Sequence, residues 1–311
     1  MLNLLSEQIK DSKEPLQIVG RESKLKTSTN KKLSIADYQG IVSYQASELV
    51  ITVKAGTSLQ ELQQVLASKN QMLSFEPPDY GNSSIGGTYA CALSGSAQAF
   101  RGSLRDFVLG IKIINGEGKI LSFGGQMMKN VAGYDVARLL VGSKGSLAVI
   151  AEMSFKVLPK VTEATYSIEM LEDDAIILMN KWAATALPLS ACAYYQGKFY
   201  YRLFGKHDKQ QAEEVDNKIW QTLNPFQTTE KEFLWRASVP STTKKIANTV
   251  AIDCCGNRRW IVSEHKPDLA YVEKWEKGLA ISKSVKHPAQ IKIEQGLKKV
   301  FDPHGVYHNK L

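Results

Sequence analysis

Apolar and polar residues alternate along short stretches in the first half of the chain, with the period of a half-buried β-strand. The longest such stretch is 149–157, where apolar residues alternate with polar ones such as Glu152 and Lys156. Two further aliphatic, β-branched stretches at 16–19 and 49–53 predict shorter strands. This part of the chain is therefore expected to build a sheet.

A helical period interrupts these strands. Leu59, Leu62 and Leu66 fall on one face of a predicted helix. Ser58 and Glu61, at its start, have the spacing of a capping box. The same region is expected to hold a hairpin and a short helix, at 107–114, 119–123 and 135–141.

After Pro159 the pattern changes to a mixture of strands and helices, as in an α+β domain. Strands are predicted at 165–170, 191–195, 199–204, 249–254 and 259–263, and helices at 173–186, 209–223 and 290–301. We therefore expect an α+β fold with a first domain at 1–160, a second at 161–290 and a C-terminal segment at 291–311.

The chain carries 39 basic and 31 acidic residues, a net charge of +8. Its lysines are dispersed, and no basic stripe with interleaved aromatic residues accompanies them, so a solvated surface is favoured over nucleic-acid binding. An acidic partner subunit is compatible with this charge.

Four cysteines, Cys91, Cys192, Cys254 and Cys255, lack the Cys-x-x-Cys spacing of zinc or iron–sulfur sites. We expect them to be reduced thiols, and we expect no bound metal. The sequence shows neither an apolar run long enough to span a bilayer nor a secretion signal, which predicts a cytoplasmic protein.

Glycine and serine cluster repeatedly between Pro77 and Ile150, in segments 83–87, 94–95, 102–110 and 142–146. Such residues let the main chain approach a ligand closely, and successive N–H groups form a nest for phosphate. Any single loop of this kind can be an ordinary turn, but together they predict a dinucleotide site. Neither a Gly-x-Gly-x-x-Gly fingerprint nor a P-loop is present, so a Rossmann or P-loop site is not expected.

The segments 83–87 and 102–110 resemble the second FAD-binding subdomain of the vanillyl-alcohol oxidase (p-cresol methylhydroxylase-type, PCMH) flavoproteins. The segments 76–78, 128–135 and 157–159 are similar to the FAD-binding E subunits of glycolate oxidase (glycolate dehydrogenase). The resemblance implies a two-lobed FAD-binding fold with an α+β cap domain at 161–290. It also implies that Asp302–Val306 returns to the FAD lobe, although the usual Asn-Pro-Gly after this motif is absent.

The resemblance implies that FAD contacts a first loop, a second loop and a later strand. The candidate residues are Gly20, Ser23, Lys24, Pro77, Pro78, Ser83, Ser84, Ile85, Gly86, Gly87, Ser94, Gly95, Arg105, Asp106, Val149 and Ile150. The first loop is also compatible with a plain turn, and Arg105–Asp106 with a salt bridge that holds its loop. Because Gly20–Lys24 contains no histidine or cysteine, noncovalent FAD is expected.

Candidates for catalysis are few. Hydroxyacid-oxidising relatives of this superfamily carry a motif His-x-Gly-Asp-Gly-Asn-x-His in the cap, and this sequence does not. Its five histidines, His207, His265, His287, His304 and His308, are isolated in polar surroundings. Arg236 and Arg259 remain as groups able to bind a substrate carboxylate or to stabilise an anionic reduced flavin.

By resemblance, the chain works beside a larger FAD subunit and an iron–sulfur subunit. The assembly would oxidise glycolate, a small 2-hydroxy acid, to glyoxylate and would associate peripherally with the inner face of the membrane. Two alternatives stay open: a non-catalytic subunit that relays electrons or organises the complex, and a standalone FAD-dependent oxidase of a larger alcohol or sugar.

Overall fold

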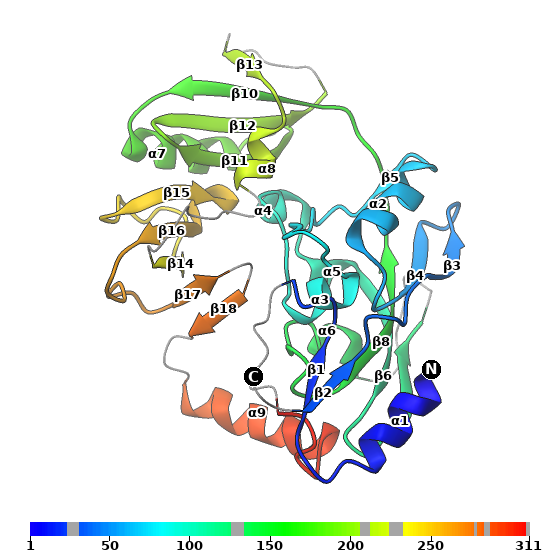
Figure 1. The fold of residues 1–311 in the computed structure, drawn as a ribbon. Coiled ribbons are helices and arrows are strands. Elements are labelled where there is room, and N and C mark those ends of the chain that lie inside the picture. Colours follow the sequence, from blue (N-terminus) through cyan, green and yellow to red (C-terminus); the bar gives the residue numbers. More distant parts are fainter. Residues whose placement is uncertain are drawn as a thin grey trace.

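The computed structural model describes residues 1–23, 31–125, 134–205, 212–223, 233–276, 279–282 and 287–308. These residues form two lobes, each built on its own sheet (Figure 1). In the first lobe the strand order is β3-β4-β8-β6-β7, and in the second β13-β10-β12-β11-β15-β16-β14-β17-β18. Neighbouring strands within both of these sheets are antiparallel.

The first lobe combines its sheet with short helices and two small strand pairs. Its elements are α1 (Leu2–Lys10), β1 (Leu16–Val19), β2 (Lys31–Ser34), β3 (Ile41–Gln45), β4 (Val50–Lys54), α2 (Leu59–Ala67), β5 (Gln71–Met72), α3 (Ile85–Ala90), α4 (Gln98–Arg101), α5 (Leu104–Phe107), β6 (Val108–Ile114), β7 (Ile120–Gly124), α6 (Val136–Leu139), β8 (Val149–Lys156) and β9 (Leu158–Pro159). Its core is mainly aliphatic and includes the three leucines of α2, all fully buried.

The second lobe contains β10 (Glu163–Glu169), α7 (Glu172–Ala183), β11 (Leu189–Tyr195), β12 (Lys198–Phe204), β13 (Glu213–Val215), α8 (Ile219–Leu223), β14 (Leu234–Ser238), β15 (Thr249–Asp253), the 3-10 turn η1 (Cys254–Gly256), β16 (Arg258–Val262), β17 (Val272–Glu276) and β18 (Leu279–Ser282). Stacked and tilted aromatic rings fill one of its cores, where Trp182 packs on Phe199 and Tyr201. The four cysteines are free thiols.

The last helix, α9 (Pro288–Phe301), leads the chain back to the first lobe (Figure 1). Tyr307 pairs with Leu16 of β1, and its hydroxyl donates to the carbonyls of Ile114 at 2.9 Å and Asn115 at 2.8 Å. The C-terminal segment thus returns to the first lobe, as expected from the sequence, and Tyr307 holds it there. The domain boundaries at 160 and 290 remain predictions.

One predicted element is wrong. Residues 209–223 were expected to form a helix, but the described part of this segment contains the strand β13 and only a short helix, α8. Ser167, Tyr166 and Thr165 of β10 pair with β13, so an open sheet edge overrides the local helical pattern. The polar, exposed residues Glu213 and Glu214 suit such an edge.

A cluster of four charged side chains joins the two lobes. Glu76 of the first lobe accepts from Arg101 of α4 at 3.0 Å and from Arg202 of β12 at 2.6 Å. Glu163 of β10 pairs with the same two arginines. The arginine side chains are only 5% and 8% exposed. Burial raises the pKa of Glu76, and the two arginines oppose that shift.

Glu76→Gln tests this cluster. Removing one carboxylate leaves two buried guanidinium groups with Glu163 alone, so the free energy of unfolding should fall by about 3 kcal/mol. Urea unfolding followed by circular dichroism measures the change. The matched control is Glu169→Gln, which removes an 82%-exposed partner of Lys198 and should cost less than about 0.5 kcal/mol. Equal losses would show that the interlobe cluster contributes no more than a surface pair.

Candidate functional site

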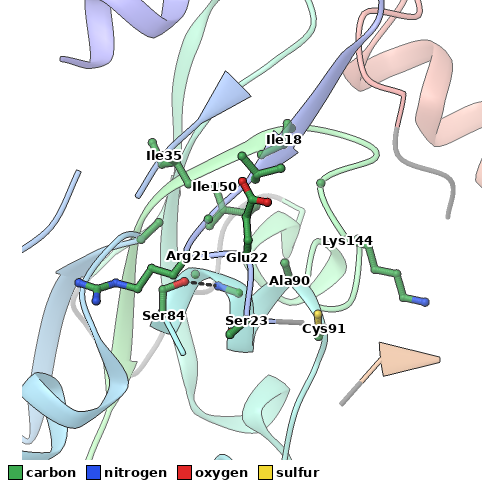
Figure 2. Close-up of a pocket in the computed structure, with 16 residues that line it drawn as sticks. Ile18, Arg21, Glu22, Ser23, Ile35, Ser84, Ala90, Cys91, Lys144 and Ile150 are labelled. Carbon is green, nitrogen blue, oxygen red and sulfur yellow. Dashed lines mark hydrogen bonds between the residues drawn. The ribbon is translucent and has the colours of Figure 1, made fainter. Parts of the chain in front are cut away.

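A pocket in the first lobe lies where the end of β1 meets the start of α3 (Figure 2). It spans about 670 Å³ of space, which includes open solvent at its mouth. Its walls are mainly apolar or backbone, from Ile18, Val19, Gly20, Arg21, Glu22, Ser23, Ile35, Ala55, Ser84, Gly86, Gly87, Ala90, Cys91, Lys144, Gly145 and Ile150. This apolar and backbone lining suits an organic ligand.

The second glycine loop is held by its own hydrogen bonds. Ser84 caps α3 by accepting from the N–H of Gly87 at 3.1 Å. The N–H groups of Ile85 and Gly86 donate to the carbonyls of Thr57 and Ala55. These donors are therefore used within the protein, and the expected phosphate nest of segment 83–87 does not form in this conformation.

Gly86 and Gly87 of this loop have different surroundings. A Cβ on Gly86 would lie 2.7 Å from the Cβ and carbonyl oxygen of Ala55, so this glycine allows α3 to pack on the chain after β4. Gly87 is half-buried and lines the pocket. It presents backbone and no side chain to the lining.

The first loop, residues 20–23, offers N–H donors for a phosphate instead. The N–H groups of 20–23 donate to no other residue of the described ranges, and Glu22 has a left-handed φ of 52°. Alternation of right- and left-handed residues is the backbone geometry of anion nests. The Arg21 side chain is turned away and donates to Asn82 at 2.6 Å and Gln39 at 2.8 Å (Figure 2).

A second cavity lies between the lobes. Its narrower part has about 350 Å³ of space that includes open solvent, and is lined by Pro78, Tyr80, Ala92, Leu93, Ser94, Gln98, Leu223, Arg236, Arg258, Trp260 and Trp275. A wider part shares Ala92, Gln98 and both arginines and adds Cys254 and Tyr271. The first pocket includes Ala90 and Cys91, so one short segment of chain, 90–94, borders both cavities.

Two arginines form the second-lobe wall of this interlobe cavity. Arg236 donates to Glu273 at 2.5 Å, and its guanidinium lies 3.9 Å from the ring centroid of Trp275. Arg258 donates to Gln98 of the first lobe at 2.8 Å and pairs with Asp253. One wall of the cavity therefore carries two guanidinium groups, each paired with a carboxylate, and aromatic rings lie beside them.

The cavity contains no group ready to accept a proton at neutral pH among the described residues that line it. Burial raises the pKa of the Tyr80 hydroxyl and of the Cys254 thiol, which keeps both protonated. No histidine or carboxylate of the described ranges lines either part of the cavity. Likewise, no cluster of metal-ligating side chains occurs within those ranges.

The structure brings many of the predicted cofactor residues to these two cavities. Those in the first pocket are Gly20, Ser23, Ser84, Gly86, Gly87 and Ile150, and those in the interlobe cavity are Pro78 and Ser94. Others only support the site: Ser83, Ile85 and Val149 are buried, and Gly95 donates to the carbonyl of Phe75. Pro77 lines a separate hollow at the lobe boundary, and Lys24 lies outside the described residues.

Arg105 and Asp106 lie apart from both cavities. Both are exposed, so the buried salt bridge considered from the sequence does not form. Asp106 accepts from the N–H and hydroxyl of Ser103 in a capping box, and Arg105 donates to the carbonyl of Val141 at 3.1 Å. Their contribution is to fix the local turn.

Of the two catalytic candidates, Arg236 lines the interlobe cavity and Arg259 does not. Arg259 is fully buried and donates to the carbonyl of Thr243 at 2.7 Å. Its neighbour Arg258 faces the cavity instead. Strand alternation explains this difference, because successive residues of β16 point to opposite faces.

Comparison with known proteins agrees with this arrangement. A family model described as FAD binding domain matches residues 5–124. Glycolate oxidase subunit GlcE of Escherichia coli (strain K12) is 40% identical over 282 residues, covering 85% of this chain and 80% of that protein. Glycolate oxidase subunit GlcD of Bacillus subtilis (strain 168) is 32% identical over 179 residues, 49% of this chain and 38% of that protein.

A solved structure, alkyldihydroxyacetonephosphate synthase, has a TM-score of 0.69 at 14% identity and covers 100% of this chain and 75% of its own. The fold and the sequence matches together define an FAD-dependent oxidoreductase with the PCMH-type fold. Within that class, the chain belongs to the family of glycolate oxidase subunit GlcE. The fold class, family and FAD cofactor predicted from the sequence are confirmed.

Gly87→Val tests the role of the second loop. Gly87 lines the pocket, and a branched side chain would add bulk there and restrict the backbone, so FAD affinity should fall at least tenfold while the fold is retained. Fluorescence titration with FAD measures affinity, and circular dichroism checks folding. Gly296→Val is the matched control, because this glycine of α9 has open space where its Cβ would lie. Unchanged FAD affinity in Gly87→Val would remove the loop from the binding site.

Proposed function

We propose that the first pocket holds the adenosine diphosphate part of FAD and that the flavin ring lies in the interlobe cavity. The apolar walls, the available N–H groups of 20–23 and the backbone of Gly87 in the lining support this fit. The segment 90–94, which borders both cavities, supports a ligand that extends from one to the other. FAD supplies the electron-accepting chemistry when it is bound.

We infer that the chain is one subunit of a complex that oxidises glycolate to glyoxylate, with a larger FAD subunit and an iron–sulfur subunit as partners. The names of the relatives GlcE and GlcD as subunits of glycolate oxidase support a multi-subunit assembly. Among the described residues no helix is long and apolar enough to cross a membrane. The net charge of +8 favours association of the complex with the anionic inner face of the membrane.

Within that complex we propose that this chain carries electrons and that its partner removes the hydroxyl proton of the substrate. The observation that carries this division is the lining of the interlobe cavity, where the described residues provide cations, a phenol and a thiol but no base. Oxidation of an alcohol requires an acceptor for its proton.

Noncovalent binding of FAD is testable directly. No cysteine or histidine occurs in the first loop, so acid precipitation of the FAD-loaded chain should release the yellow colour into the supernatant. Absorbance of the two fractions measures the split. Cys91 lines the first pocket, so a Cys91→Ser variant is the control. Colour retained in the pellet of the parent chain but not of this variant would identify a covalent bond.

The division of labour predicts that the isolated, FAD-loaded chain reduces dye slowly or not at all with glycolate. Co-expression with the larger flavoprotein and the iron–sulfur subunit should restore glycolate-dependent dye reduction. Chemical reduction of the isolated chain by dithionite is the control that its flavin is competent. Rapid anaerobic bleaching of the flavin by glycolate in the isolated chain would contradict the proposed division and assign oxidation to this subunit.

A further inference from the structure

The last helix, α9, is attached to the first lobe through its C-terminal turns. Phe301 is buried, Leu297 packs against the core of the first lobe, and the Lys298 ammonium donates to two carbonyls of that lobe at 2.6 and 2.8 Å. Residues 287–293, at the other end, are all exposed (Figure 1). Because a single helix of this length is only marginally stable by itself, its N-terminal turns gain little from the rest of the described chain.

An apolar stripe of α9 faces solvent, and it consists of Ala289, Ile293, Gly296 and Val300. The side chains of Ile293 and Val300 are 64% and 70% exposed. A Cβ on Gly296 would meet nothing within 4 Å. A surface helix turns its apolar face to the core and its polar face to solvent, so an apolar stripe on the outside indicates contact with another molecule.

The spacing of the α9 stripe favours a second helix as the occupant. Apolar residues at i, i+4, i+7 and i+11 are the seam positions of packed helices. Small residues alternate with large ones along this seam, and helix axes approach more closely where side chains are small. Glycine is a poor helix former, and a closely packed neighbour accounts for its presence at Gly296. A lipid surface suits the stripe less well, because interfacial helices carry Leu, Phe or Trp on their apolar face.

The charges beside the stripe favour an acidic partner. Lys292 and Lys299 are exposed, and each directly precedes a large residue of the stripe, so both lie along the same edge of it. Lys298 pairs with Asp302, whereas neither edge lysine has a salt bridge within the described ranges. Two copies of α9 packed antiparallel would bring the edge lysines of both together, and this repulsion disfavours a second copy of the chain.

We propose that the α9 stripe docks a helix of a partner subunit, and that this helix presents an apolar seam with acidic residues along its edge. The apolar seam supplies burial, and the lysine edge selects and orients the acidic partner. The inference rests on the proposed function, which supplies the partner subunits. It adds the surface through which this chain meets one of them.

The test is assembly of the FAD-loaded full chain with the larger flavoprotein and the iron–sulfur subunit, each titrated onto the immobilised chain by interferometry. Ile293→Asp should weaken assembly by about tenfold or more, because it would bury an unpaired carboxylate in the contact. Ile177→Asp, at a 66%-exposed position of α7, is the matched control and should leave assembly unchanged. Gly296→Val should also weaken assembly while FAD affinity stays that of the parent chain.

Charge reversal tests the lysine edge. The double variant Lys292→Glu, Lys299→Glu should weaken assembly and make it less sensitive to salt than in the parent chain. Lys181→Glu, at an exposed position of α7, is the control and should change neither property. Circular dichroism and FAD affinity check that each variant is folded.

Several results would overturn the docking surface. Parental affinity in a folded Ile293→Asp chain would do so and would leave the proposed complex intact; if that variant does not fold, Gly296→Val gives the same decision. Dimerisation of the isolated chain in light scattering that Ile293→Asp abolishes would assign the stripe to a second copy. Sedimentation with phosphatidylserine vesicles that Ile293→Asp abolishes, with assembly unchanged, would assign it to a membrane. If the parent chain binds neither subunit, the proposed complex is refuted and this surface with it.

Discussion

The contact between the lobes depends on buried charge. Glu76 and Arg101 pair within the first lobe, and Glu163 and Arg202 pair within the second. Two further pairs, Glu76–Arg202 and Arg101–Glu163, cross the contact and gather all four buried charges into one cluster, which favours this orientation of the lobes. In this orientation Gln98 of the first lobe meets Arg258 of the second across the interlobe cavity.

Glycine acts in two separate ways around the first pocket. At Gly86 it lets one piece of backbone approach another, which builds the pocket wall. Gly87 lines the pocket, where it presents backbone and no side chain. The N–H groups of the second loop donate within the protein and hold the shape of that loop. The N–H groups of the first loop are therefore better placed to donate to a phosphate. The glycine-rich loop thus shapes the pocket while a less conspicuous loop supplies its donors.

Strands with clear alternation were predictable from the sequence, and β1, β4, β8 and the β6–β7 hairpin lie where the pattern placed them to within a residue or two. The α2 helix begins after Ser58, whose hydroxyl accepts from Glu61 as its spacing indicates. The edge strand β13 was not predictable, since its pairing with β10 is a contact across more than forty residues that leaves no local signal. The candidate site was predictable mainly through resemblance, because the hydrogen bonds that use up the second loop's donors come from distant carbonyls.

The two adjacent arginines of β16 show what more could have been predicted from the sequence alone. Arg258 and Arg259 are chemically identical, and composition cannot separate them. Once residues 258–262 are assigned to a strand, the alternation of side chains separates the two arginines. Arg258 lies on the same face as Trp260, and Arg259 lies on the opposite face. The opposite face places Arg259 in the interior, where it donates to the carbonyl of Thr243 and its Nε and Nη1 find no acceptor within the described ranges. Two adjacent arginines thus have different surroundings: one is enclosed in the lobe, and the other faces the cavity between the lobes.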